Sequence, residues 1–312
     1  MSPIAAAPMR KLLVTGEEGF VGRSIRAMAQ DIRLAFGWEL ASAPASYDLR
    51  DRASLDALVA ATRPDGVIHL AGISFVPDSF KDPEATLQIN LIGTLHLLQA
   101  LKKAGFSGSF LYVSSGDVYG KLGAEDLPVA EDHLPRPSNP YAVSKLSAES
   151  LCRQWAQVET FRILVARPFN HIGPGQREDF VLANMARQIV RIGRGLQAPF
   201  IQVGDIDVKR DFLDVRDVVG AYLRLLDKGQ DGEIYNVCSG EGRAIRDLIL
   251  ALQRLTGVEA ELQRDAARFR PADQREVVGS NRKLIAATAW KPAHLLDETL
   301  RTILEDWESR AS

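Results

Sequence analysis

Tyr141 and Lys145 give the strongest chemical signal in the sequence, where the chain reads SNPYAVSK from residue 138 to 145. Asn139 can cap a helix and Pro140 suits its first position, so the two side chains stand one turn apart on the same face. A free phenol has a pKa of about 10, which is too high for efficient proton transfer at neutral pH. A nearby ammonium, together with an oxidised nicotinamide ring, would lower that pKa. The pair therefore predicts proton transfer coupled to a dinucleotide cofactor.

Ser115 lies in a serine-rich turn, Ser114–Gly120, directly after an expected buried strand at Phe110–Ser114. This turn falls at the carboxyl edge of a parallel sheet, where such folds bind ligands. The Ser115 hydroxyl could hydrogen-bond the same carbonyl oxygen that Tyr141 protonates. A surface Tyr–Lys pair or a serine-rich turn alone would be unremarkable. Their joint occurrence, each after the right element, favours a carbonyl-reducing site.

Three glycines follow the first expected strand, in the run TGEEGFVG that begins at residue 15. Gly16 allows a tight turn, Gly19 lets the backbone approach a pyrophosphate, and Gly22 lets a helix and strand pack closely. A helix beginning near Phe20 would point free N–H groups at the phosphates. The spacing is G-x-x-G-x-x-G, which a plain glycine-rich turn could also show. Its place in the first strand–helix unit favours dinucleotide binding.

Asp48 and Leu49 follow the expected second strand, Trp38–Ser42. A carboxylate there could accept a hydrogen bond from an adenine amino group, although an exposed turn aspartate explains it equally well. No Asp or Glu clearly ends this strand to bind a ribose 2′-hydroxyl. That leaves room for a 2′-phosphate, so the sequence favours NADPH over NADH.

Strand and helix patterns alternate along the first half of the chain. Continuous apolar runs, typical of strands buried on both faces, are Lys11–Thr15, Gly66–Leu70, Phe110–Ser114 and Arg162–Ala166. Expected helices are Leu55–Ala61, Ala85–Lys103, Pro140–Gln157, Asp179–Arg194, Val215–Asp227, Ala244–Leu255 and Leu295–Arg310, and Glu233–Val237 is a further expected strand. In the helix over Ala85–Lys103, the expected stripe is Leu87, Leu91, Thr94, Leu95 and Leu98.

These patterns predict an α/β protein with a doubly wound parallel (Rossmann-type) sheet and a second, smaller, discontinuous α/β substrate domain. We assign residues 1–170 and 211–238 to the dinucleotide-binding domain. Residues 171–210 and 239–312 are assigned to the substrate (sugar-nucleotide) domain.

Composition narrows the function further. A length of 312 residues, 46% of them hydrophobic, can bury a large core without disulfides or metals. The formal net charge of −2 gives no reason to expect nucleic acid or a membrane surface as a partner. The two cysteines, Cys152 and Cys238, show no metal-site spacing, and we expect no bound metal. Neither a signal peptide nor a transmembrane stretch is evident, so a cytoplasmic location is expected.

The sequence resembles the extended short-chain dehydrogenases/reductases over essentially its whole length. The matching pieces are Thr15–Gly22, Asp48-Leu49, Leu70–Gly72, Asn90, Ser115, Tyr141–Lys145, Arg167–Asn170, Arg210–Phe212 and Arg270-Pro271. Within that family, Ser114–Gly120, Ala166–Gln176 and Val203–Val215 look most like the reductases of GDP-6-deoxy-4-keto-D-mannose, which make GDP-D-rhamnose.

The resemblance implies a role for each matching residue. Ser115, Tyr141 and Lys145 would be the catalytic triad, and Asn90 would support a water relay behind Lys145. Cofactor binding would involve Gly16, Gly19, Phe20, Val21, Asp48, Leu49, Leu70, Ala71, Gly72 and Asn90, besides Tyr141 and Lys145. Substrate binding would involve Ser74, Ser115, Gly116, Asp117, Tyr141, Asn170, Arg210 and Arg270. The last three would hold the ribose–diphosphate end, which an arginine fork suits. A homodimer through the helices holding Tyr141 and Ala85–Lys103 is also implied.

Two departures bear on the reaction. Related dehydratases carry Glu where this chain has Asp117, and those acting on dTDP-sugars carry Asp where it has Gly116. Both changes disfavour dehydration. The expected activity is therefore NAD(P)H-dependent reduction of the C4 keto group of GDP-4-dehydro-6-deoxy-D-mannose to GDP-D-rhamnose. The alternatives are a GDP-mannose 4,6-dehydratase, another sugar-nucleotide epimerase or dehydratase, or a non-catalytic dinucleotide sensor.

Overall fold

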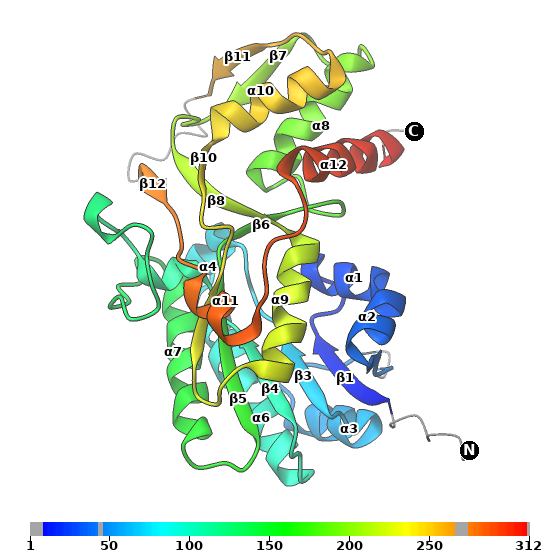
Figure 1. Ribbon diagram of the computed structural model, residues 1–312, viewed down its shortest axis with the longest axis vertical. Coiled ribbons are helices and arrows are strands. Elements are labelled where there is room, and N and C mark those ends of the chain that lie inside the picture. Colours follow the sequence, from blue (N-terminus) through cyan, green and yellow to red (C-terminus); the bar gives the residue numbers. More distant parts are fainter. Residues whose placement is uncertain (1–8, 43–45, 266–273, 311–312) are drawn as a thin grey trace. The chain divides into compact units, whose positions relative to one another are not determined.

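Six strands form the central sheet in the order β2-β1-β3-β4-β5-β9. The computed structural model describes residues 9–42, 46–265 and 274–310. Each pairing from β2 to β5 is parallel, and Figure 1 shows β1, β3, β4 and β5 side by side. The strands are β1 (Arg10–Thr15), β2 (Trp38–Leu40), β3 (Gly66–His69), β4 (Ser109–Val113), β5 (Arg162–Pro168) and β9 (Ile234–Val237). The prediction of a doubly wound parallel sheet is confirmed.

Helices follow the strands along the chain and cover the apolar runs from which the strands were predicted. β3 and β4 are buried along their full lengths. One core cluster joins β3 and β4 to the leucines of α3 (Arg52–Thr62) and α6 (Gly93–Lys103), among them Leu55, Leu58, Leu97 and Leu101. The remaining helices of this part are α1 (Phe20–Ala27), α2 (Ala29–Phe36), α4 (Val76–Lys81), α5 (Pro83–Leu87) and α7 (Pro140–Ala156). Two short 3₁₀ turns are η2 (Gly116–Tyr119) and η3 (Ala124–Asp126).

The long helix expected over Ala85–Lys103 is interrupted. Between α5 and α6 the chain forms a π-helical turn, η1 (Gln88–Ile92). A π turn adds about one residue to the helical period, so it shifts the buried face of everything that follows. The expected stripe is partly wrong: Thr94 and Leu98 are fully buried as predicted, but Leu87 is exposed. Leu97 and Leu101, which lie outside the expected stripe, are also fully buried.

The second half confirms the expected helices and adds strands that the sequence did not reveal. The helices are α8 (Val181–Gly193), α9 (Val215–Lys228), α10 (Ile245–Thr256), α11 (Arg282–Thr288) and α12 (Leu296–Arg310). The strands are β6 (Asn170–Ile172), β7 (Phe200–Val203), β8 (Lys209–Asp214), β10 (Gly242–Ala244), β11 (Glu261–Arg264) and β12 (Glu276–Val277). β8 is the hub, pairing with β6, β10 and β12.

The chain divides into two units. The first comprises Met1–Val118, Pro137–Ala166 and Tyr222–Ile234, and the second comprises Tyr119–Arg136, Arg167–Ala221 and Tyr235–Ser312. Residues 119–136, 167–170, 211–221 and 235–238 thus fall outside the first unit, although the sequence division placed them in the dinucleotide-binding part. The binding role of each unit stays a prediction.

Among residues 9–42, 46–265 and 274–310, no helix is both long and apolar enough to cross a membrane. The same residues contain no group of three or more His, Cys, Asp or Glu side chains that could hold a metal ion.

Candidate active site

The helix that carries Tyr141 and Lys145 begins as its sequence predicts. Asn139 Oδ1 accepts a hydrogen bond from the Ala142 N–H at 2.8 Å, and Pro140 occupies the first turn. Both Tyr141 and Lys145 are buried on α7. The structure therefore brings the phenol and the ammonium onto one protected helix face in the first unit.

Lys145 is tied to the end of β4. Its Nζ donates to the Val113 carbonyl oxygen at 2.9 Å and lies 6.0 Å from the centre of the Tyr141 ring. Burial lowers the pKa of Lys145 from 10.5 to about 8. The side chain thus stays cationic at neutral pH, but its charged form is held at a cost in desolvation.

The pKa of Tyr141 is raised in the protein without a cofactor. Burial is the main cause, the negative charge of Asp117 raises the pKa further, and a hydrogen bond with Ser115 lowers it. The sequence prediction concerns Lys145 acting together with an oxidised nicotinamide ring. The lowering of the pKa in the cofactor-bound protein therefore stays a prediction.

Ser115 sits where β4 gives way to η2. It is buried, and its Oγ accepts a hydrogen bond from the Asp117 N–H at 3.1 Å. Gly116 and Asp117 are the first two residues of η2. The structure thus unites Ser115, Tyr141 and Lys145, with Asp117 close enough to influence the phenol.

The glycine loop has the geometry that its spacing predicts. Gly16 has a φ of +78°, and a Cβ there would lie 2.7 Å from the Ala71 nitrogen. A Cβ on Gly22 would lie 2.4 Å from the Gly16 carbonyl oxygen, so helix and loop meet backbone to backbone. Gly19 precedes α1, whose first N–H groups receive no side-chain cap. Uncapped N–H groups at a helix start suit a phosphate.

Tyr47 supports this loop, and sequence reasoning missed it. Its hydroxyl oxygen accepts a hydrogen bond from the Gly16 N–H at 2.8 Å. The neighbouring Asp48 forms an ion pair with Arg50. Hydrogen bonds from the Arg50 side chain and backbone lower the pKa of Asp48 to about 2. Leu49 is buried against Gly93. Adenine binding at Asp48 stays a prediction.

The segment after β3 lines the same edge of the sheet. Leu70 and Ala71 run beside the end of β1, where both backbone N–H groups meet Thr15. Gly72 lies against Asn90 and Lys145: a Cβ there would be 2.7 Å from Asn90 Oδ1 and 3.8 Å from Lys145 Nζ. These close approaches show why glycine occupies position 72.

Asn90 occupies the π turn and joins the loop after β3 to α7. Its Oδ1 accepts from the Ile73 N–H at 2.8 Å, and its Nδ2 donates to the Ile73 carbonyl and to Ser144 Oγ. π turns often occur at functional sites. The water relay expected at Asn90 stays a prediction, since the contacts described are to protein atoms.

The expected substrate residues fall in both units. Ser74 is exposed in the loop before α4, in the first unit. Asn170 and Arg210 lie on the paired strands β6 and β8 of the second unit, where Asn170 Nδ2 donates to the Asp211 carbonyl. Arg270 lies outside the described residues. Substrate contacts at all four positions stay predictions.

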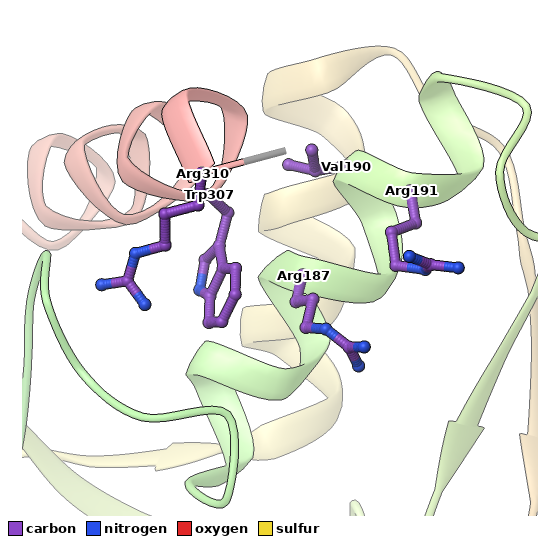
Figure 2. Close-up of a pocket in the computed structure, with 5 residues that line it drawn as sticks. All are labelled: Arg187, Val190, Arg191, Trp307 and Arg310. Carbon is purple, nitrogen blue, oxygen red and sulfur yellow. The ribbon is translucent and has the colours of Figure 1, made fainter. Parts of the chain in front are cut away.

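A separate pocket lies between α8 and α12 of the second unit, and Figure 2 shows the residues that line it. Its volume is about 130 Å³. It is lined by Arg187, Val190, Arg191, Trp307 and Arg310. Arg187 pairs with Glu178 at 2.8 Å, and Arg310 pairs with Asp306 at 2.6 Å. Because carboxylates already neutralise two of its cations and it contains no expected site residue, this pocket is not the candidate site.

The parallel sheet, the glycine loop and the buried Ser–Tyr–Lys group define an extended short-chain dehydrogenase/reductase. The chain belongs to the family described as GDP-mannose 4,6 dehydratase, which matches residues 41–303. The resemblance found in the sequence motifs is thereby confirmed.

Individual relatives span nearly the whole chain. A GDP-6-deoxy-D-mannose reductase from Pseudomonas aeruginosa is 56% identical over 301 residues, which cover 96% of this chain and 98% of the relative. A solved structure of RMD from the same species, complexed with NADPH, is 55% identical with a TM-score of 0.92, covering 96% and 99% of the two chains. A GDP-6-deoxy-D-talose 4-dehydrogenase from Aggregatibacter actinomycetemcomitans is 29% identical, covering 88% and 90%.

Proposed function

We propose that the protein uses NADPH to reduce the C4 keto group of GDP-4-dehydro-6-deoxy-D-mannose, giving GDP-D-rhamnose. The observation that carries this proposal is the 56% identity, over nearly the full length of both chains, to a GDP-6-deoxy-D-mannose reductase. The buried Tyr141 beside Ser115 fits this reaction, because reduction of a ketone requires a proton donor at the carbonyl oxygen.

The first unit offers features that fit NADPH. Gly16 and Gly19 let the loop turn in close contact with backbone atoms, and α1 begins without a side-chain cap, which suits a pyrophosphate. Gly72 lets the segment after β3 pack closely against Asn90, beside Lys145. The NADPH in the related solved structure supports the choice of cofactor. When bound, NADPH supplies the hydride.

Three side chains would handle the oxygen of the ketone. Tyr141 donates its proton to the oxygen as negative charge develops there. Ser115 donates a second hydrogen bond to the same oxygen. Lys145, cationic at neutral pH, binds the cofactor ribose and stabilises the phenolate left after proton transfer.

A dehydratase is the second candidate, since the matching family is described by that activity. Dehydration requires a base to remove a proton from the sugar, and the related dehydratases place Glu at position 117. Asp117 is one methylene shorter, and its backbone N–H is already bonded to Ser115. This difference supports reduction.

The deciding experiment is to mix the purified protein with GDP-4-keto-6-deoxymannose and NADPH and to follow the absorbance of the reduced cofactor. We expect stoichiometric loss of NADPH. A parallel reaction with GDP-mannose and NADP⁺, analysed for the keto product, tests dehydration. Product from GDP-mannose without NADPH loss in the first reaction would refute the proposal, and inactivity in both would favour a non-catalytic sensor.

A homodimer through α7 and the α5–α6 segment is a further proposal. Val143 on α7 and Leu87 on α5 are 41% and 37% exposed, and Phe80 nearby is 62% exposed. These residues line a shallow pocket of about 410 Å³ together with residues 137–140. Light scattering should give twice the chain mass, and Val143→Asp should give the monomer. A monomeric wild type would contradict the proposal.

The cytoplasmic location stays a prediction.

A further inference from the structure

The end of β4 is joined to α7 at three consecutive residues. The Val113 carbonyl accepts a hydrogen bond from Lys145 at 2.9 Å. Ser114 Oγ donates to Glu149 Oε2 at 3.1 Å. Ser115 then shares a hydrogen bond with Tyr141. The last residue of β4 and the two that follow it thus each have a hydrogen-bond partner on α7. Two of the three contacts involve residues of the proposed triad.

Among the residues that make these three contacts, Glu149 on α7 has no part in the proposed mechanism. It lies one turn after Lys145 on α7, and only 2% of it is exposed. Burying a carboxyl group is costly unless it is hydrogen-bonded, so an apolar residue of similar volume would be the cheaper choice for packing alone. A polar group retained at such a position calls for a role beyond filling space.

The position of Ser114 shows what that role is. Its backbone N–H is fixed by the Ala166 carbonyl of β5 at 2.8 Å, and its side chain is fixed by Glu149. The strand therefore leaves the sheet in one orientation. The next residue is Ser115, whose Oγ must reach both Tyr141 and the Asp117 N–H. Small rotations of Ser114 would displace that hydroxyl.

We propose that Glu149 is a positioning residue, which clamps Ser114 to α7 and thereby sets the Ser115 hydroxyl against Tyr141. The inference rests on the proposed reductase function. Glu149 touches neither substrate nor cofactor in this role. It acts through the serine beside the reacting oxygen, where a displacement of about 1 Å can cost about 100-fold in rate.

Three substitutions test the clamp. Glu149→Leu removes the acceptor at similar volume, Glu149→Gln keeps an acceptor oxygen, and Ser114→Ala removes the donor. Ser150→Ala is the matched control, because Ser150 is exposed on the same helix and bonds only within it, to the Leu146 carbonyl, among the hydrogen bonds described. For each variant, kcat with GDP-4-keto-6-deoxymannose, the KM for NADPH and the melting temperature are measured.

We expect Glu149→Leu and Ser114→Ala to lower kcat by about 10- to 100-fold, with the KM for NADPH within about twofold of wild type. Glu149→Gln should retain most of the activity, and the control all of it. In a Ser115→Ala background, Glu149→Leu should cause little further loss, because the group it positions is absent. A purely structural role would lower kcat equally in both backgrounds.

Wild-type kcat in Glu149→Leu, or an equal loss in the Ser115→Ala background, would overturn the clamp. If Glu149→Leu fails to fold, Ser114→Ala decides by the same criteria. The wild-type rate tests the reductase function separately, since an inactive wild type refutes that function whereas the ratios between variants test only the clamp.

Discussion

Replacing Lys145 with methionine should remove activity and, at neutral pH, reduce a cost in folding. Methionine has a similar length and no charge, so it fills the same buried space. The desolvated ammonium has a pKa of about 8 in the folded protein against an ordinary value of 10.5. Below pH 8 both folded and unfolded states carry the proton, and the folded state bears the full penalty. Above pH 10.5 neither carries it and the penalty disappears.

The size of this effect follows from the two pKa values. Their difference, at about 1.36 kcal/mol per pKa unit, corresponds to about 3 kcal/mol of destabilisation at pH 7. At pH 9.5 the remaining penalty is about 1 kcal/mol. Losing the hydrogen bond to Val113 costs the variant about 1 kcal/mol, but at every pH alike. The stability gap between variant and wild type should thus shrink by about 2 kcal/mol from pH 7 to pH 9.5.

Urea denaturation of both proteins at pH 7, 8.5 and 9.5 measures the gap. Comparing variant with wild type cancels the contributions of groups that titrate in this range and lie away from position 145. Lys103→Met is a matched control on an exposed lysine, and no comparable pH-dependent gap is expected there. A gap that stays constant with pH would refute the argument that burial of this ammonium is costly. Reductase activity in Lys145→Met would refute its role in the site.

Three further predictions concern the same edge of the sheet. Tyr141→Phe should nearly abolish turnover while NADPH affinity, from fluorescence titration, stays within about twofold, and retained turnover would sink its role as proton donor. Gly16→Ala should lower the free energy of unfolding by about 2–4 kcal/mol in urea denaturation, because the positive φ is strained for alanine and the new Cβ would collide with Ala71. The same variant should weaken NADPH binding. Gly105 has a φ of +70° and open space around it, so the control Gly105→Ala should show only the cost of the positive φ and leave NADPH binding unchanged. Tyr47→Phe removes the acceptor for the Gly16 N–H and should weaken NADPH binding by about tenfold, corresponding to one hydrogen bond, and unchanged affinity would contradict a role in shaping the loop.

Local sequence signals predicted most of the first unit. The cap at Asn139 and the proline after it located the start of α7, and the four-residue spacing then placed Tyr141 and Lys145 on one face. The glycine spacing predicted both the left-handed turn at Gly16 and the backbone contact at Gly22. These features depend on residues close in sequence, which is why a single sequence reveals them.

The sequence did not predict the π turn or the hydrogen bonds between residues far apart in the chain. The leucine pattern gave no indication of the π turn over Gln88–Ile92, which adds about one residue to the helical period and shifts the buried face of α6. Tyr47 meets Gly16 across 31 positions, and Ser114 meets Glu149 across 35. Such pairs form only once the sheet has assembled, so spacing rules cannot find them.

Burial acts on both members of the Tyr141–Lys145 pair. It raises the pKa of Tyr141, together with the negative charge of Asp117, and it lowers the pKa of Lys145 to about 8. Both shifts favour the uncharged form of the side chain, because desolvation penalises a charge of either sign. Proton transfer from Tyr141 leaves a phenolate in this buried place, so it requires nearby positive charge. Lys145, with its Nζ 6.0 Å from the centre of the Tyr141 ring, supplies one such charge, and an oxidised nicotinamide ring would supply a second.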